Sequence, residues 1–368
     1  MTTAPDGPLP ALERLLSWLN RERIDAAFVT GPSSIAYLTG FQAEPLERVM
    51  ALAVGGEAAV LIAPGLEAEP ARRAARGVEV VAWRDGDDPY QMIARVLGPA
   101  PQRLAVETEH VTLRAHSDLA RCVRARELVD ASPLLWDLRL RKAGSELQRL
   151  QEAARITDQV TGTALAHARA GMTEVEIGRL LDDAIYAAGA SLSFPSLVQA
   201  GANSADPHHR PGQQRLRRGD LLLLDFGAAT GGYCADTTRT VVAGEPTAEQ
   251  QRIHDLVLQA HDAAIAAVRP GVTTGAVDEA ARSVIRSGGH GDHFFHRVGH
   301  GLGLAEHEPP SLDPGSTTVL EPGMVFTIEP GIYLPGWGGI RIEDDLVVTD
   351  TGCRLLTHAA RTLAPLPA

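Results

Sequence analysis

Two aspartates in the second half of the chain are spaced so that a β-hairpin could place them side by side. An uninterrupted apolar run, residues 221–224, ends in Asp225 and is typical of a strand buried on both faces. Residues 233–242 are rich in Thr and Val, contain Asp236 and predict the returning strand. With the turn centred at 230–231, the two aspartates are expected to be direct cross-strand partners.

Carboxylates in such positions repel each other, because directly opposed Cβ atoms lie roughly 4.5 to 5.5 Å apart. A buried pair must therefore share a proton or a cation. The alternative is that one aspartate caps the turn while the other pairs with Arg239. Arg239 lies an odd number of positions from Asp236, so alternation places it on the other face of the strand. This pair alone favours a metal only slightly.

A second pair of carboxylates, Glu329 and Glu343, has comparable spacing. Residues 324–328 and 340–348 predict two strands, of which the first ends at Glu329 and the second carries Glu343. The midpoint between the glutamates is Gly336, in a segment rich in Gly and Pro that suits a turn. The two glutamates can therefore also face each other.

Arg341 could hold one of these carboxylates in place. Ile340 and Ile342 share the apolar face of the predicted strand, and Arg341 lies with Glu343 on the other. A guanidinium on that face can orient a carboxylate through paired hydrogen bonds. The alternative is a simple ion pair of Arg341 with Glu343 or with Glu329.

Histidines could supply the nitrogen ligand. The glycine-rich segment 299–304 lets its backbone approach a site closely and contains His300, with His307 seven residues later. His296 precedes His300 by four, which is the spacing of a zinc-binding pair on a helix, but no Glu lies between them and the glycines oppose a helix. Upstream, His208 lies in a polar loop. Any single histidine is more often a surface or core residue, so the inference depends on their joint placement.

Four carboxylates and one histidine form a hard, oxygen-rich ligand set. Such a set suits Mn, Mg or Fe, with Co or Zn as alternatives, and it suits two ions better than one. Two ions ~3.5 to 4 Å apart can bind a bridging water, lower its pKa and polarise an electrophile. The expected reaction is a hydrolysis.

The elements that would position these groups fall into two regions. In the first, short apolar runs alternate with helical patterns, which indicates a compact mixed α/β domain without a catalytic constellation. Strands are expected at 26–29, 50–54, 59–63 and 78–83, and helices at 12–19, 67–76 and 90–97. The pattern loosens after residue 131, and a domain boundary is expected near 138. A long helix should then open at Ser145, with Gln148 completing a capping box.

The second region contains a weak internal repeat. Residues 156–173 and 253–273 follow one design, in which a helix is stopped by a glycine and the next helix starts at a threonine. Two copies suggest one domain built from two similar halves, and chance similarity is the alternative.

Composition restricts the partners of the protein. The 368 residues include 34 basic and 46 acidic side chains, a formal net charge of −12, and Lys142 is the only lysine, which argues against a nucleic-acid binder. Cys122, Cys234 and Cys353 are too scattered for a disulfide framework and fit a reducing compartment. The N-terminus, residues 1–10, has no basic start, and no apolar run reaches the ~18 residues of a membrane span. We therefore expect a cytoplasmic protein with small or peptidic ligands.

From about Lys142 to Leu363 the chain resembles the pita-bread metallopeptidases, which include methionine aminopeptidase, aminopeptidase P and prolidase. The matching pieces are Ser193 to Pro195, Pro207-His208, Gly219-Asp220, Asp225 to Gly227, Tyr233 to Thr240, Gly299 to Pro309, Glu329 to Tyr333 and Arg341 to Asp344. Residues 35–41 are similar to the N-terminal domain of prolidases and creatinases. The resemblance implies an α+β pita-bread catalytic domain with pseudo-twofold halves at 139–368, preceded by a smaller α/β domain of creatinase/prolidase type at 1–138.

The resemblance also implies roles for individual residues. The metal ligands of the family fall on Asp225, Asp236, His300, Glu329 and Glu343. Asp236 and Glu343 would bridge the two ions, and Glu329 would take a proton from the attacking water. The remaining implied catalytic groups are His208, His307 and Arg341, and the implied substrate-binding groups are His296 and Tyr333. His208 and His307 would bind the substrate and stabilise the tetrahedral intermediate.

The implied protein is a metal-dependent Xaa-Pro peptidase, with two divalent ions, Mn first and Co, Zn or Fe as alternatives. It would cleave dipeptides or short peptides before proline and form a homodimer. A prolidase is favoured slightly over an aminopeptidase P, because the chain is short and shows no extra insertions. One alternative is a related hydrolase or lyase acting on a small amide or osmolyte, because the ligands determine water activation and not the substrate. Another is a pure binding module.

Overall fold

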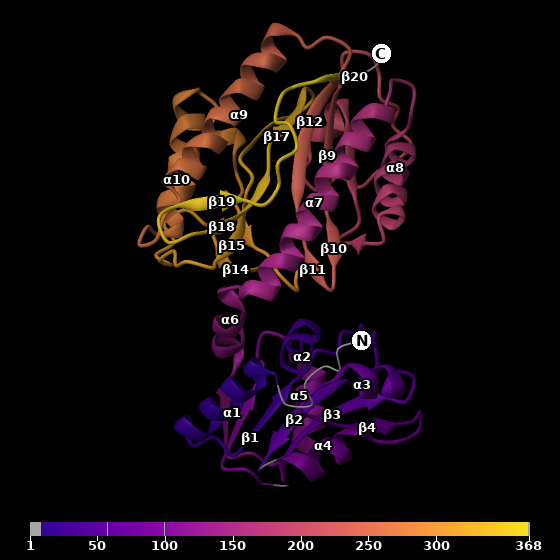
Figure 1. Cartoon of the computed structure of the whole chain (residues 1–368), viewed down its shortest axis with the longest axis vertical. Coiled ribbons are helices and arrows are strands. Elements are labelled where there is room, and N and C mark those ends of the chain that lie inside the picture. Colours follow the sequence, from indigo (N-terminus) through magenta and orange to yellow (C-terminus); the bar gives the residue numbers. More distant parts are fainter. Residues whose placement is uncertain (1–8, 57, 99, 367–368) are drawn as a thin grey trace. The chain divides into compact units, whose positions relative to one another are not determined.

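The computed structural model describes residues 9–56, 58–98 and 100–366. The chain divides into two compact units between Arg139 and Leu140 (Figure 1). The sequence predicts no targeting signal in residues 1–10. Most of this segment lies outside the described residues. Within the described ranges, none of the helices combines the length and apolar character needed to cross a bilayer.

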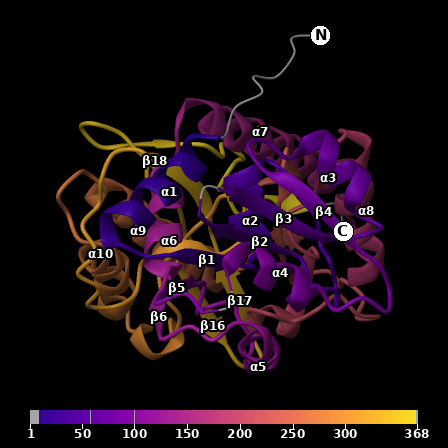
Figure 2. The same cartoon turned by 90° about the horizontal axis from the view of Figure 1, so that it is seen from below.

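The N-terminal unit is a six-stranded mixed sheet with helices on both faces (Figures 1 and 2). The sheet order is β4-β3-β2-β1-β5-β6, and β2 runs antiparallel to both of its neighbours. The strands are β1 (Ala26–Val29), β2 (Ala51–Gly55), β3 (Ala58–Pro64), β4 (Glu79–Trp83), β5 (Arg103–Val106) and β6 (Glu127–Asp130). The helices are α1 (Pro10–Glu22), α2 (Pro32–Thr39), α3 (Ala68–Ala74), α4 (Pro89–Leu97), α5 (Leu113–Cys122) and α6 (Ser132–Leu140). The expected mixed α/β domain is confirmed, with two strands, β5 and β6, beyond those predicted.

The C-terminal unit contains two similar halves, each with a helix pair. The pairs are α7 (Gly144–His167) with α8 (Glu174–Ala187), and α9 (Ala248–Ala267) with α10 (Thr274–Ser287). Thr173 and Thr273 cap the second helix of each pair through their hydroxyls. The preceding glycines bond alike, since Gly171 N donates to Leu216 O and Gly271 N to Leu320 O. Matching backbone contacts confirm the expected two halves.

Helix α7 begins one residue earlier than predicted, and with a different cap. The N–H of Ala143 donates to Glu146 Oε2 at 2.7 Å, so Glu146 takes the part expected of Gln148. A glutamate at the third helical position can reach back to the N–H that precedes the helix, whatever residue stands there.

The strands of the C-terminal unit lie between the two helix pairs (Figure 1). The first half contributes β7 (Ser191–Leu192), β8 (Leu197–Ala200), β9 (Leu221–Phe226), β10 (Ala228–Thr230), β11 (Tyr233–Cys234), β12 (Thr237–Ala243) and the C-terminal β20 (Pro365–Leu366). The second contributes β13 (His300–Gly301), β14 (Glu308–Ser311), β15 (Val325–Ile328), β16 (Gly331–Leu334), β17 (Gly338–Arg341), β18 (Asp344–Val348) and β19 (Cys353–Leu355). Two short 3-10 helices, Gly201–Ala205 and Gly291–His293, complete the unit.

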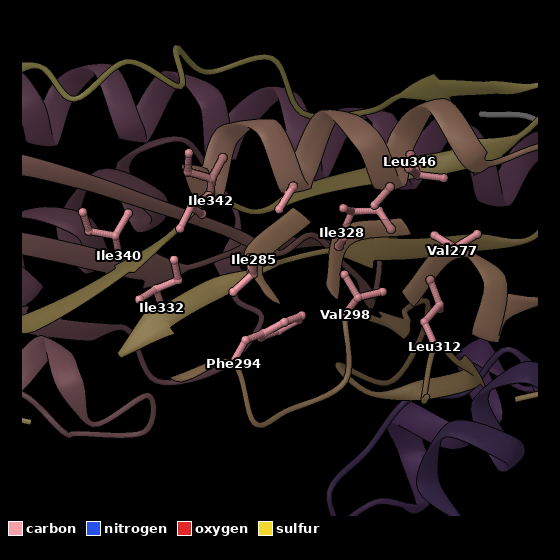
Figure 3. Packing of buried hydrophobic residues seen from close by; sticks show 14 of the residues in the cluster. Val277, Ile285, Phe294, Val298, Leu312, Ile328, Ile332, Ile340, Ile342 and Leu346 are labelled. Carbon is pink, nitrogen blue, oxygen red and sulfur yellow. The ribbon is translucent and has the colours of Figure 1, made fainter. Parts of the chain in front are cut away.

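Core packing decides which face of each strand carries the polar residues. Ile328 of β15 and Ile340 of β17 pack with Val277 and Ile285 of α10 (Figure 3). Because side chains alternate along a strand, the positions next to these isoleucines face the opposite side. Ile342 lies in the same apolar cluster, which confirms the predicted separation of the isoleucines from their polar neighbours.

The same rule applies in the first half. Leu222, Leu224 and Phe226 of β9 pack in the cluster that includes α7 and α8. Asp225 therefore projects from the other face of β9. The acidic residues of both halves are turned away from the helices that cover them.

Candidate metal centre

The hairpin that carries Asp225 and Asp236 has a different register from the one predicted. Asp225 pairs with Thr238, and Thr230 pairs with Tyr233, so the turn is centred between Gly231 and Gly232. Both glycines have positive φ, 53° and 83°, as a two-residue hairpin turn requires. The expected direct pairing of the two aspartates is therefore wrong.

Asp236 nevertheless reaches the same site as Asp225. It lies in the gap between β11 and β12, where its N–H donates to Asp345 Oδ2 at 2.9 Å. Asp236 lies two residues before Thr238, the partner of Asp225, so alternation places both aspartates on one face of the hairpin. Both aspartates line one cavity.

The register of the second pair matches the prediction. Ile328 pairs with Asp344, and Gly331 pairs with Arg341, in one continuous register that brings Glu329 opposite Glu343. The Gly336 turn predicted from sequence has positive φ, 79°.

The predicted ligands from both halves converge on one point. One ligand atom from each of Asp236, His300 and Glu343 lies within 4.8 Å of the others. His300 Nε2 is 3.7 Å from Asp236 Oδ2 and 3.5 Å from Glu329 Oε1. Asp225 joins the group beside Asp236. All five candidate ligands border one cavity.

Arg341 and Thr238 hold two of the carboxylates. Arg341 Nη2 donates to Asp225 Oδ2 at 2.6 Å, and its Nε donates to Thr238 Oγ1 at 2.8 Å. The hydroxyl of Thr238 donates in turn to Glu343 Oε2 at 2.6 Å. Neither ion pair considered from sequence, with Glu343 or with Glu329, is formed, and Arg341 pairs with Asp225 instead.

His300 is oriented as a metal ligand would be. Its Nδ1 lies 3.2 Å from the carbonyl oxygen of Gly301, which can only accept, so Nδ1 carries the proton. The unprotonated Nε2 then faces Asp236 and Glu329. Burial lowers the pKa of His300 to about 3. The neutral ring with a fixed tautomer is the form that binds metal ions.

The carboxylates are costly to ionise where they are. Burial, together with the neighbouring acids, raises the pKa of both Asp236 and Glu343 well above the usual range. Burial also raises the pKa of Glu329 to about 7, against the lowering effect of Arg341. Desolvation and like charge act together here, and a cation would relieve both.

The donor set fits divalent cations. Asp236 Oδ1 is buried and has no hydrogen-bond partner among the described residues. An orphaned carboxylate oxygen costs free energy unless something binds it. Asp225, Asp236, Glu329 and Glu343 offer oxygen and His300 offers one nitrogen, a combination typical of Mn and related ions.

A cavity of about 430 Å³ opens over this cluster. Besides the candidate ligands and Arg341, its lining residues are Phe194, Leu197, Asp206, Pro207, His208, Phe295, His296, Arg297, Glu306 and His307. The cavity thus combines apolar walls with a few polar groups, as small-molecule sites do.

His208 and His307 stand at the rim of the cavity. Both are exposed, and His208 N donates to Asp206 Oδ1 at 3.2 Å. The ring of His307 lies against that of His300, with centroids 3.8 Å apart. Its Nδ1 accepts from Arg297 Nη2 at 3.3 Å.

Tyr333, which the resemblance implies to be a substrate-binding residue, is buried beside the cavity. Its side chain is 1% exposed, and it accepts from Arg341 Nη1 at 3.0 Å. Its hydroxyl lies 3.0 Å from His296 Nε2, and His296 does line the cavity. Tyr333 therefore contacts two residues that line the cavity, His296 and Arg341.

Three residues that position the site were missed by reasoning from sequence. Thr238 lies two positions after Asp236, so strand alternation could have indicated it. Arg297 and Glu174 have no such local signal. Buried Glu174 holds the chain on both sides of His208, accepting hydrogen bonds from Ala200 N, Asn203 Nδ2, His209 Nε2 and Gly212 N.

Comparison with known proteins agrees with this geometry. The sequence model of metallopeptidase family M24 matches residues 148–350. The chain belongs to this family. The model of the creatinase/prolidase N-terminal domain matches residues 12–141 of the same chain. The family resemblance and the fold class expected from the motifs are confirmed, and the protein is a peptidase by family.

Individual M24 relatives cover nearly the whole chain. The putative dipeptidase YkvY of Bacillus subtilis is 38% identical over 96% of this chain and 98% of its own. The structure of an Xaa-Pro dipeptidase from Bacillus anthracis matches with TM-score 0.89 and 35% identity, over 97% of this chain and 99% of that one. An X-Pro aminopeptidase from Thermotoga maritima matches with TM-score 0.88 and 31% identity, over 96% and 99%.

Proposed function

We propose that this M24 protein is an Xaa-Pro dipeptidase that works with two divalent cations. The observation that carries the proposal is the convergence of Asp236, His300 and Glu343 within 4.8 Å, below a cavity of about 430 Å³. The relatives named as dipeptidases support the choice of substrate class. Short proline-containing peptides are thus the proposed substrates, and a homodimer is the proposed assembly.

The residues that would hold the two ions are Asp225, Asp236, His300, Glu329 and Glu343, and Asp236 and Glu343 would be shared between them. Mn is the proposed metal, and Co, Zn and Fe are the alternatives that this donor set also suits. When bound, the ions lower the pKa of water and polarise the scissile carbonyl.

Glu329 is proposed to receive the proton of the attacking water. Its Oε1 lies 3.5 Å from His300 Nε2 on the wall of the cavity, where a carboxylate can accept a proton from water. The same proton can pass to the proline nitrogen as the peptide bond breaks. Thr327 Oγ1 donates to Glu329 Oε1 at 3.3 Å and helps to orient this carboxylate.

His307 and His208 are proposed to bind the carbonyl oxygen as negative charge develops on it. Because His307 Nδ1 accepts from Arg297, the neutral ring must carry its proton on Nε2. A hydrogen-bond donor is what a developing oxyanion needs. His208 faces the same cavity from the first half of the unit.

A substrate panel with Mn-loaded protein tests the proposal. Xaa-Pro dipeptides should be cleaved faster than Xaa-Ala dipeptides of the same first residue, and faster than Xaa-Pro-Xaa tripeptides. Preference for the tripeptides would indicate an aminopeptidase instead. The Glu329→Gln protein, purified in the same way, controls for contaminating peptidases. Absence of cleavage of every peptide, with turnover of a small amide, would overturn the proposal.

A further inference from the structure

Two arginines line the cavity, and they differ in what they bind. Arg341 is 4% exposed and is paired with Asp225, with its other nitrogens bonded to Thr238 and Tyr333. Its charge is therefore balanced inside the protein by Asp225, and each of its three nitrogens already donates one hydrogen bond. Arg341 therefore has no unpaired charge to offer to a carboxylate.

Arg297 is half-buried and has only neutral partners. Its Nη1 donates to Ser311 Oγ at 2.8 Å, and its Nη2 donates to His307 Nδ1 at 3.3 Å. In the described part of the chain, no acidic side chain forms an ion pair with it. Glu306, also on the cavity wall, lies 3.8 Å from His307 Nε2 and is not paired with Arg297. A guanidinium has five N–H donors, so three of those of Arg297 remain for a ligand.

The location of Arg297 suits a group close to the reacting bond. His307, which it contacts, lies with its ring centroid 3.8 Å from that of the candidate ligand His300. In an Xaa-Pro dipeptide, the terminal carboxylate is one residue beyond the scissile carbonyl, a span of roughly 3.3–3.6 Å. A longer peptide would present a neutral amide at that point.

We propose that Arg297 binds the C-terminal carboxylate of the substrate and so makes the site selective for dipeptides. The inference rests on the proposed Xaa-Pro activity and names the residue that sets peptide length. Charge-assisted hydrogen bonds between guanidinium and carboxylate are about twice as strong as neutral ones. Ser311 and His307 each accept only one of the five N–H groups of Arg297.

The test compares a dipeptide acid with its amide. Leu-Pro and Leu-Pro-NH2 differ only in the charge that Arg297 is proposed to bind. In Mn-loaded protein, kcat/KM should be higher for the acid. Arg297→Gln should lower the acid-to-amide ratio roughly 10- to 100-fold, since it removes a hydrogen bond to a charged group. Arg297→Lys, which keeps the charge, should retain most of the preference.

Two controls separate this role from a structural one. Gln at position 297 can still donate to His307 Nδ1. If the substitution acted only through His307, kcat/KM would fall equally for the acid and the amide, and the acid-to-amide ratio would not change. Ser311→Ala removes a partner of Arg297 but keeps the cation, and the ratio should stay close to that of the unaltered protein.

Binding of product gives a readout that does not need turnover. Calorimetric titration of Mn-loaded protein with proline and with prolinamide should show a preference for proline that Arg297→Gln removes. Equal binding of the two by the unaltered protein, or an unchanged ratio in Arg297→Gln, would overturn the role of Arg297. Loss of all peptide cleavage with the proline preference intact would instead refute only the proposed activity.

Discussion

The guanidinium of Arg341 joins the two halves of the catalytic unit by donating to Asp225 Oδ2 at 2.6 Å. Arg341 belongs to β17 in the second half, and Asp225 belongs to β9 in the first. The hydroxyl of Thr240 reinforces this junction, since it donates to Arg341 O and accepts from Arg341 N. A single buried cation thereby holds Asp225 directly and is linked to Glu343 through Thr238.

Thr238 should control metal affinity without touching the metal. Its hydroxyl is the link between Arg341 Nε and Glu343 Oε2, so Thr238→Val leaves both without this partner. Loss of a partner behind a metal ligand typically lowers affinity 10- to 100-fold. Calorimetric titration with Mn measures it. Thr238→Ser keeps the hydroxyl and should bind nearly as tightly as the unaltered protein; equal affinities for the Val and Ser variants would contradict the link.

Glu329→Gln should abolish most of the turnover while the fold persists. Removal of a general base typically costs 10²- to 10⁴-fold in rate. The amide keeps one oxygen toward the ions, so metal content should fall less than kcat. Steady-state kinetics together with metal analysis of the same sample decides the outcome. A variant that retains full kcat would remove Glu329 from the mechanism.

Without metal, the protein should become less stable as the pH rises through the range in which Glu329 titrates. Burial raises the pKa of Glu329 from 4.5 to about 7, so between these values the folded state holds a proton that the unfolded chain has lost. The free energy of unfolding therefore falls as the pH increases across this window. Asp236 and Glu343 have pKa values raised in the same direction.

Thermal unfolding between pH 5 and pH 7.5 after chelation measures this effect. The Tm of the chelated protein should drop with increasing pH, and the drop should be smaller in Glu329→Gln. Excess Mn should reverse it, because binding to the folded state alone adds stability. The same pH slope in both chelated proteins would show that Glu329 is not responsible.

Gly299→Ala should displace His300. A Cβ at Gly299 would overlap the carbonyl oxygen of Thr327, so the segment carrying His300 would have to move away from β15. Overpacking of this kind typically costs about 1–3 kcal/mol. Urea unfolding and Mn titration should both show the loss.

Gly162→Ala is the matched control for that substitution. Gly162 lies within α7, and a Cβ there meets nothing within 4 Å. Replacement of glycine by alanine in a helix should stabilise it by roughly 0.5–1 kcal/mol. A loss of stability in both variants would mean that crowding at Gly299 is not the cause.

Local patterns in the sequence reliably predicted which face of a strand a side chain lies on, but they were less reliable for the register of a hairpin. Strand alternation correctly separated Ile340 and Ile342 from Arg341, because the period of two follows from backbone geometry. The turn before Asp236 was displaced, because consecutive glycines and small residues allow several turn positions. The register of this hairpin depends on the positive φ of Gly231 and Gly232. Their being glycines was not enough to predict it.

The amino-acid sequence by itself determined the candidate ligands, the two repeated halves and the membership in the M24 family, since composition, spacing and motifs are properties of the chain. Only the tertiary structure decided that Arg341 pairs with Asp225, that Thr238 supports Glu343, and that Arg297 has no acidic partner among the residues that the structure describes. These contacts join residues far apart in sequence, and the choice among competing partners depends on which side chains packing brings within hydrogen-bond distance.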